Sequence, residues 1–218
     1  MSDVFEEVND DLRRENMEKL WKKYGPWVIA LCVLVVAIVG GSKAFESYQL
    51  SKAVNASNAY IEYVSALNAE GNASDKGQTE FKAVQDSGHT GYIYLSQMSK
   101  ASALAANNST ARAVILYDLV AANTSLSQNN RDIATVLAGY LLVDTASLQD
   151  VIKHVETINV VENAFRFQAR EQIGLSAFRA GDFKLSSDTF LELSQNAQTP
   201  DSIRARANQI VALLVSKL

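Results

Sequence analysis

The sequence predicts an all-α protein, in which a single N-terminal transmembrane helix is followed by a solenoid of helical pairs. Three observations predict this fold. A stretch of 19 residues from Tyr24 to Ser42 carries no charge. The remaining chain is rich in helix-favouring Ala, Leu, Gln and Lys, with no alternating strand pattern bounded by Asn-Gly or Asp-Gly turns. Small and aromatic residues also recur near the ~34-residue period of stacked helix pairs.

The uncharged stretch has the length of a membrane span. At about 1.5 Å per residue it covers roughly 28 Å, close to the hydrocarbon core of a bilayer. Aromatic residues flank it, Tyr24 and Trp27 at its start and Phe45 and Tyr48 after its end, as expected at headgroup depth. We expect a transmembrane helix over residues 24–43, and the alternative is a buried helix of a soluble protein.

The charges beside the span predict its orientation. Five basic residues precede it and two follow it at a comparable distance, which places the N-terminus in the cytoplasm. A cleaved signal peptide is the rival interpretation, but the preceding region is long and the apolar core exceeds the usual signal length. The basic residues before the span are Arg13, Arg14, Lys19, Lys22 and Lys23, and those after it are Lys43 and Lys52.

Residues 1–23 form a separate cytoplasmic segment in this prediction. Apolar residues from Val4 to Tyr24 recur on one helical face, and acidic residues come early while basic residues come late. An amphipathic helix of this kind favours contact between its basic end and anionic membrane lipid. A solvated helix that only sets topology and a docking site for a cytoplasmic partner both fit the pattern.

Residues 44–218 form an outer domain long enough for a hydrophobic core. Clusters of Gly, Asn, Ser and Pro divide it into nine predicted helices, with boundaries good to a few residues. These are Lys43–Leu67, Asp75–Asp86, Tyr92–Ala106, Thr110–Ala122, Arg131–Asp144, Ser147–Ile158, Glu162–Ala180, Phe183–Asn196 and Asp201–Leu218.

The clearest repeat unit is IGLSAFRAGDFKLSSDTF, residues 173–190. Gly174 allows two helices to approach closely, Gly181-Asp182 makes the turn, and Ser186 and Phe190 are the small and aromatic positions of the second helix. The unit resembles the tetratricopeptide repeat. Gly139 lies 35 residues before Gly174, and a third copy starts near Ala101. A non-repeating helical bundle remains the alternative.

The sequence offers no pattern for catalysis or for a cofactor. His89 and His154 lack a nearby Cys or an HExxH-type arrangement, and Cys32 lies within the span. Phosphate-binding glycine motifs and the GxSxG nucleophile motif are absent. The net charge of -4 and the lack of a basic patch argue against a nucleic-acid partner. We expect no enzyme, no metal, no cofactor and no small-molecule substrate.

The whole chain is similar to the YfgM-like family of bacterial inner-membrane proteins. The similarity lies in the order of EEVNDDLRRENMEKLWKKYGPW, one span, AFESYQLSKAVNASNAYIEYVSAL, LSQMSKASALAANN and the repeat ending AGDFKLSSDTF. The resemblance implies a single-pass inner-membrane protein with a periplasmic tetratricopeptide-repeat-like domain. It also implies an ancillary subunit of the Sec translocon, with translocon subunits and a membrane-anchored periplasmic chaperone as partners.

The expected function is therefore a non-enzymatic scaffold that links the translocon to periplasmic chaperones during protein export. One alternative is a stress-signalling regulator that tethers a cytoplasmic partner through the N-terminal segment, and another is a holdase that binds unfolded clients directly. Such stacks bind partners on the concave surface lined by the first helix of each pair. The residues expected near that surface are Tyr140, Val143, Asp144, Glu171, Leu175, Phe178 and Arg179.

Overall fold

The computed structural model describes the backbone of residues 3–68, 77–215 and 217, and the side chains of these residues except 3–13, 15 and 16. This described part contains nine α-helices and no strand, which confirms the predicted all-α class. The helices are α1 (Asp3–Asn68), α2 (Gln78–Asp86), α3 (Thr90–Ala106), α4 (Thr110–Ala121), α5 (Gln128–Thr145), α6 (Leu148–Val155), α7 (Arg166–Ala180), α8 (Phe183–Gln195) and α9 (Asp201–Leu214).

The chain divides into two compact units, Met1–Val54 and Asn55–Leu218. The first unit is formed by most of α1, which runs without interruption through the uncharged stretch. The helices expected at 24–43 and at Lys43–Leu67 are therefore parts of one helix. Gly40 and Gly41 do not end it, because neither adopts the left-handed backbone that terminates helices at glycine.

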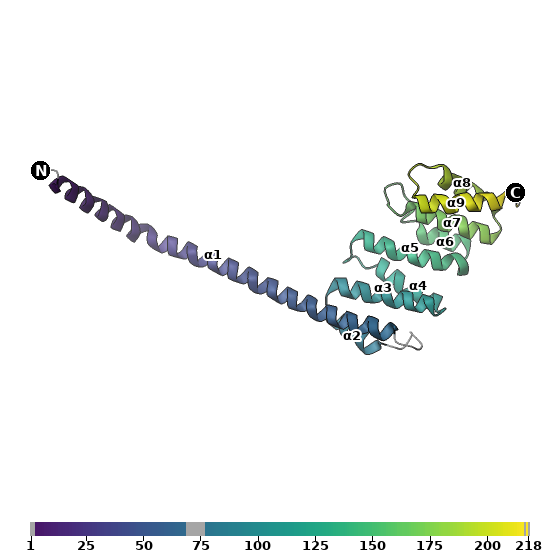
Figure 1. The fold of residues 1–218 in the computed structure, drawn as a ribbon, viewed down its shortest axis with the longest axis horizontal. Coiled ribbons are helices and arrows are strands. Elements are labelled where there is room, and N and C mark those ends of the chain that lie inside the picture. The colour runs from purple at the N-terminus through teal and green to yellow at the C-terminus, as the bar shows by residue number, and fades with distance from the viewer. Residues whose placement is uncertain (1–2, 69–76, 216, 218) are drawn as a thin grey trace. The chain divides into compact units, whose positions relative to one another are not determined.

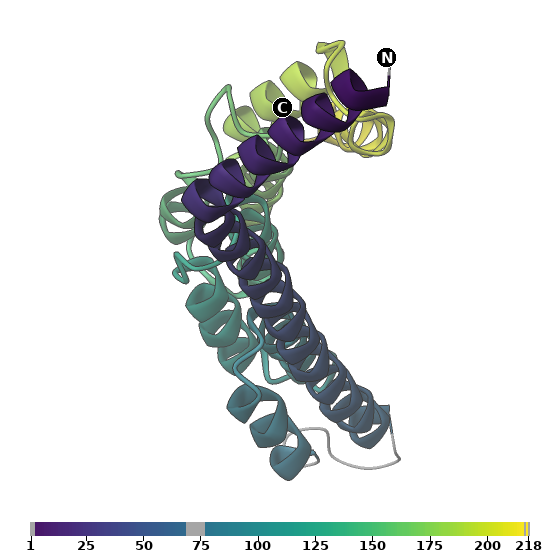
Figure 2. The ribbon, with the colours of Figure 1, turned by 90° about the vertical axis from the view of Figure 1, so that its left-hand side faces the viewer.

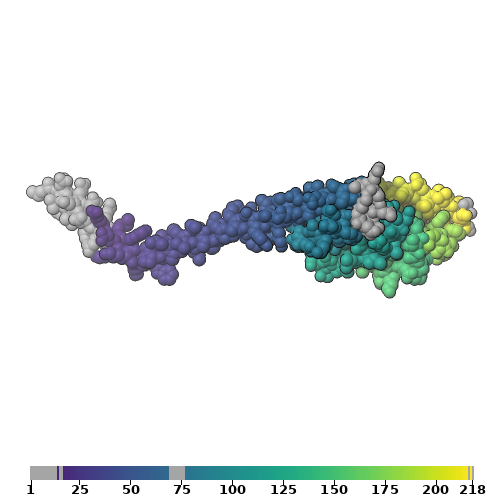
Figure 3. Space-filling view, turned by 90° about the horizontal axis from the view of Figure 1, so that it is seen from below, coloured from purple at the N-terminus to yellow at the C-terminus, as the bar shows by residue number. Residues whose placement is uncertain are grey.

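Between residues 17 and 54 the side chains of α1 are almost all exposed, although many are large and apolar. Figure 3 shows this violet-to-blue segment as a lone helix on the face in view. Apolar side chains around an entire helix are stable only in an apolar surrounding. The helix is long and apolar enough to cross a membrane, and it is a candidate span.

The purple N-terminal part of α1 bends, as Figure 2 shows, and this part contains Pro26. Proline lacks the N–H that would complete the helical hydrogen bond, and its ring crowds the preceding turn. The Trp21 indole lies against Gly25, 3.3 Å from the position a Cβ would occupy. Most of the amphipathic pattern predicted upstream falls on residues 4–13, whose side chains lie outside the described residues, and it stays a prediction.

The helices of the second unit stack in chain order, so that each packs mainly against its neighbours (Figure 1). The pairs are α3 with α4, α5 with α6 and α7 with α8, and α9 follows as a single helix. Helices α5, α7 and α9 also pack on one another in sequence. Helices α5, α7 and α9 consequently form one layer, as the first helices of other stacked-pair solenoids do.

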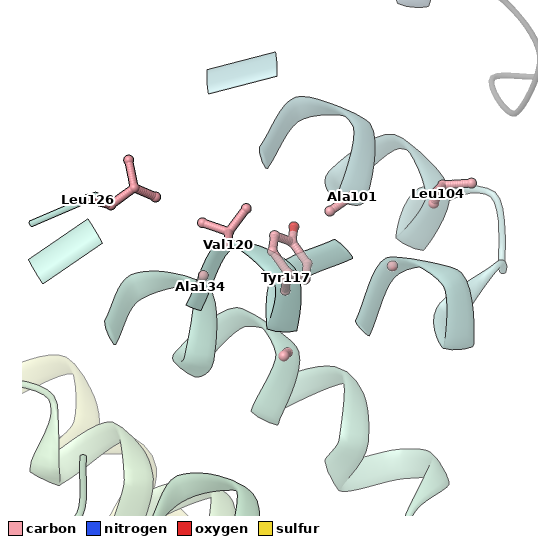
Figure 4. Close-up of a cluster of buried hydrophobic side chains, with 8 residues drawn as sticks. Ala101, Leu104, Tyr117, Val120, Leu126 and Ala134 are labelled. Atoms are coloured by element: carbon pink, nitrogen blue, oxygen red, sulfur yellow. The ribbon is translucent and has the colours of Figure 1, made fainter. Parts of the chain in front are cut away.

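A cluster of buried side chains joins the first pair to α5. Figure 4 shows members of this cluster: Ala101 and Leu104 of α3, Tyr117 and Val120 of α4, and Ala134 of α5. The small alanines let the helices approach, and the larger side chains fill the space between them. Two further clusters continue the core through α6, α7, α8 and α9.

The α7–α8 pair has the geometry predicted for the repeat unit. A Cβ on Gly174 would lie 2.8 Å from the Phe190 ring, so only glycine allows this approach. The Ser186 hydroxyl donates to the Gly174 carbonyl at 2.9 Å across the same contact. Gly181 takes a left-handed φ of 80°, and the Asp182 carboxylate accepts from the Leu185 amide at 3.0 Å to begin α8. The predicted roles of these residues are confirmed.

Candidate functional site

A groove with a volume of about 450 Å³ lies on the layer of first helices, over α5, α7 and α9. Each helix contributes to it: α5 one residue, α7 two and α9 three, and Phe190 of α8 adds part of its floor. This volume is in the usual range of protein binding pockets. The lining residues are Tyr140, Glu171, Leu175, Phe190, Arg206, Gln209 and Ile210.

Three polar side chains from three helices meet in this groove. Arg206 donates through Nε to Glu171 Oε1 at 2.6 Å and through Nη2 to Glu171 Oε2 at 2.8 Å. The Tyr140 hydroxyl donates to Glu171 Oε2 at 2.6 Å. Both carboxylate oxygens of Glu171 are thus hydrogen-bonded, although the residue is only 2 % exposed. We call Tyr140, Glu171 and Arg206 the polar triad.

Burial and charge act together on the polar triad. Burial raises the pKa of Tyr140, and the hydrogen bond to Glu171 raises this pKa further. The hydrogen bond to Glu171 raises the pKa of the Arg206 guanidinium, which therefore stays charged. A buried carboxylate is stable only with such partners, because removing it from water costs several kcal/mol by itself. The triad fixes the position of α9 on α7 and α5.

The remaining lining residues make the groove largely apolar. Leu175 and Ile210 are half-buried, Phe190 is buried beneath them, and Gln209 is exposed. The Arg206 side chain is 51 % exposed, so part of its guanidinium faces solvent. Apolar walls beside a Tyr and an Arg are the composition found where a few residues dominate protein–protein binding. The groove suits a short polypeptide segment.

The structure brings three of the seven expected site residues into this groove. Tyr140, Glu171 and Leu175 line it. Asp144 and Arg179 lie together elsewhere, because the Arg179 guanidinium donates to the backbone carbonyl of Asp144 at 3.3 Å and to that of Ala146. Arg179 therefore holds the end of α5 and the residue after it through these hydrogen bonds. It does not line the groove.

Of the other two expected residues, Val143 is buried and Phe178 is partly buried. Val143 is only 7 % exposed. Phe178 packs on the buried cluster of α7, α8 and α9, with its ring 5.7 Å from that of Phe183. Both occupy the expected helices, but neither lines the groove, because the helical turn carries their side chains past the open face.

Sequence reasoning missed the contribution of α9. Arg206 belongs to the polar triad, and Gln209 and Ile210 line the groove beside it. A signal was present: Arg206 lies 35 residues after Glu171, one repeat period along the chain. Extending the repeat beyond Pro200 would have placed both residues at the same position of successive first helices.

The two histidines, the side chains best suited to acid–base or metal chemistry, make contacts inside the domain. The His154 ring bonds through Nε2 to the Thr135 carbonyl at 3.1 Å, and its Nδ1 lies 3.7 Å from Asp118 Oδ1. The His89 ring packs on Tyr92, although its buried Nδ1 has no hydrogen-bond partner among the described residues. Within the described residues, no group of three or more His, Cys, Asp and Glu side chains could hold a metal ion.

A family model described as a tetratricopeptide repeat-like domain matches residues 18–208. The match begins before the uncharged stretch and ends within α9, so it includes α5, α7, α8 and the part of α9 that carries Arg206. The chain matches no curated protein and no solved structure.

Proposed function

Because the chain belongs to the tetratricopeptide repeat-like domain family, we propose that it is a membrane-anchored, non-enzymatic scaffold that holds a protein partner in the groove over α5, α7 and α9. The observation that carries this proposal is the polar triad. It places a half-exposed arginine side chain and a tyrosine between apolar side chains on the face that helical-pair stacks use for binding.

The triad also makes the groove rigid before a partner arrives. Tyr140 comes from α5, Glu171 from α7 and Arg206 from α9, so their hydrogen bonds fix three neighbouring helices together. A preformed surface loses less conformational entropy on binding than a mobile one. The carboxylate is already satisfied, so the partner adds hydrogen bonds to Gln209 and the free edge of Arg206.

We assign the membrane span to residues 24–43, with residues 1–23 in the cytoplasm and residues 44–218 in the periplasm of a bacterial cell. Support comes from the long exposed apolar helix and from the five basic residues before the span. Trp21 and Tyr24 lie near its entrance, and the Lys23 ammonium lies 5.4 Å from the Tyr24 ring. These residues suit the headgroup layer, with membrane lipid as a second contact.

The cellular role that fits this arrangement is an ancillary subunit of the Sec translocon. The scaffold would link translocon subunits to a membrane-anchored periplasmic chaperone while exported proteins emerge. Support comes from the order of motifs along the chain and from the single anchor that keeps the helical domain beside the membrane. A groove for a protein segment gives such a subunit the means to retain a chaperone.

Affinity purification of the full-length protein from mildly solubilised membranes tests the proposal. Gln209→Glu adds a carboxylate at the exposed edge of the groove, whereas Asn208→Glu adds the same charge at the next exposed position of α9, outside the groove. Quantitative mass spectrometry compares the proteins recovered with the two variants. Gln209→Glu should lose translocon subunits or the chaperone, and Asn208→Glu should retain them.

The outcomes separate the parts of the proposal. If both variants lose the same partner, the added charge weakens capture wherever it lies on α9, and the groove is not specifically involved. If both variants recover every partner in full, the groove is not the binding site. Recovery of a periplasmic partner without translocon subunits would retain the scaffold and reject the Sec role. Circular dichroism of both variants checks that the helical content is unchanged.

A further inference from the structure

A second groove, with a volume of about 610 Å³, lies on the same layer of first helices, toward the N-terminal side of the solenoid. It is formed within the second unit by the end of α1, by α3 and the residue after it, and by one residue each of α4 and α5. The α5 residue is Leu137, which precedes Tyr140 of the first groove by three positions and so lies on the same face of α5. The two grooves meet at this helix.

No charged side chain lines the second groove among the described residues. Val64 and Leu67 of α1, Met98 of α3 and Leu137 of α5 supply its apolar surface, and Leu137 is 38 % exposed. A charge of a ligand would be buried there without a counter-ion, which is strongly unfavourable. The first groove differs, because it contains the ionised pair of Glu171 and Arg206.

Three polar side chains of the second groove already have partners inside the protein. The hydroxyls of Tyr60 and Ser99 are 3.1 Å apart and share a hydrogen bond. The Asn107 amide donates to the Ala103 carbonyl at 2.8 Å. These groups lose nothing when an apolar side chain covers them, since their hydrogen bonds remain.

We propose that the second groove binds an uncharged polypeptide segment with apolar side chains, which reaches it from a partner held in the first groove. The uncharged lining, the hydrogen bond between the Tyr60 and Ser99 hydroxyls and the continuity through Leu137 and Tyr140 assign this occupant. Met98 adapts its shape to different apolar side chains, so the groove accepts a class of segments and not one sequence. The inference rests on the proposed function, because it extends the same binding face.

Fluorescence anisotropy of the full-length protein in lipid nanodiscs tests the inference. The probe is a fluorescein-labelled peptide of alternating Leu and Ser, and the comparison peptide has one Leu replaced by Asp and another by Lys, so that both peptides have the same net charge. The leucine peptide should bind at least about tenfold more tightly than the Asp/Lys peptide. Nanodiscs without the protein measure any binding to lipid.

Matched variants locate the binding. Leu137→Asp places a charge in the groove, and Ala106→Glu does so at an exposed position of its rim. Ile115→Asp introduces a charge on α4 outside the groove, where the side chain is 66 % exposed. Both groove variants should weaken peptide binding at least about tenfold, and Ile115→Asp should leave it unchanged.

Several results would overturn the inference. These are equal binding of the two peptides, unchanged binding by Leu137→Asp and Ala106→Glu, or binding to empty nanodiscs alone. The peptide assay reports on the second groove alone. Gln209→Glu, which changes only the first groove, should therefore leave peptide binding intact. Failure of the peptide assay with normal partner capture rejects only this inference, and peptide binding without capture rejects only the proposed scaffold.

Discussion

Arg206 lies on the last helix of the solenoid, 35 residues after Glu171, and holds both oxygens of this buried carboxylate at 2.6 and 2.8 Å. The two residues differ greatly in exposure, since Glu171 is buried and Arg206 is half exposed. The Glu171 carboxylate is therefore part of the interior, whereas the Arg206 side chain reaches it from the rim of the groove. The pair closes the C-terminal end of the stack and forms the polar centre of the first groove.

Arg206→Met should destabilise the helical domain. Met preserves the apolar stem of the side chain but leaves the Glu171 carboxylate with Tyr140 as its partner. Removal of one partner from a fully buried pair costs about 3–5 kcal/mol, and we expect about 2–3 kcal/mol here because water reaches Arg206. Chemical denaturation monitored by circular dichroism measures the change in the free energy of unfolding.

The double variant Arg206→Met with Glu171→Met controls this prediction. It removes the unpaired charge together with the hydrogen bonds, so it should recover much of the lost stability. If Arg206→Met alone changes the free energy of unfolding by less than about 0.5 kcal/mol, the value typical of surface positions, the pair does not hold α9 in place.

Alkaline pH should weaken the contribution of Tyr140. Its folded-state pKa is raised by burial and by Glu171, whereas the unfolded side chain ionises near pH 10. The stabilisation is complete below about pH 10 and is lost as pH rises toward the folded-state pKa, because the unfolded state releases its proton first. Tyr140→Phe should cost about 1.5 kcal/mol at neutral pH.

The difference in stability between the wild type and Tyr140→Phe should therefore shrink as pH increases above about 10. Denaturation of both proteins at a series of pH values measures it. Ionisation of lysines affects both proteins alike and cancels in the comparison. A difference that stays constant up to the highest pH at which both proteins fold would contradict the raised pKa.

Gly174→Ala should destabilise the α7–α8 pair. The added methyl would lie 2.8 Å from the buried Phe190 ring, and overpacking of this kind costs about 1–3 kcal/mol. Gly91→Ala on α3 is the matched control, because its nearest neighbour would be the His89 ring at 3.4 Å, an ordinary contact. Thermal melts should show a lower Tm for Gly174→Ala only, and Phe190→Leu should partly restore it.

Removal of the cap at the start of α8 should have a smaller and local effect. The Asp182 carboxylate accepts from the Leu185 amide at 3.0 Å, and Asp182→Ala should cost about 1 kcal/mol. Asp182→Asn retains an acceptor at this position and should cost less. Hydrogen exchange should accelerate at the first amides of α8, and unchanged exchange there with Asp182→Ala would argue against the cap.

The fold was predictable where a local pattern determines it. Gly174, Ser186 and Phe190 could be assigned before the structure, because helix pairs of constant length place the same contact at the same spacing. The separate helices expected before and after the span are one helix in α1, since glycine weakens a helix without ending it. The continuity of α1 depends on the backbone conformation of its glycines, which the composition of the sequence does not specify.

The site was predictable only in part. Tyr140, Glu171 and Leu175 were found from the register of the first helices, and all three line the groove. Val143 shows why the register alone is insufficient, since it lies on the correct helix but is buried. Arg206 was missed because its role depends on how α9 packs on α7. Only tertiary packing brings the two charges together, although their spacing of one repeat was visible in the sequence.

Site-specific photo-crosslinking in living bacterial cells tests the central claim most directly. A photoreactive amino acid at position 209 faces the edge of the first groove, and the same amino acid at position 208 on α9 lies outside it. The account predicts a defined crosslink at 209, to a periplasmic chaperone or a translocon subunit, and none to that protein at 208. The same crosslinked protein at both positions, or no crosslink at 209, would contradict it.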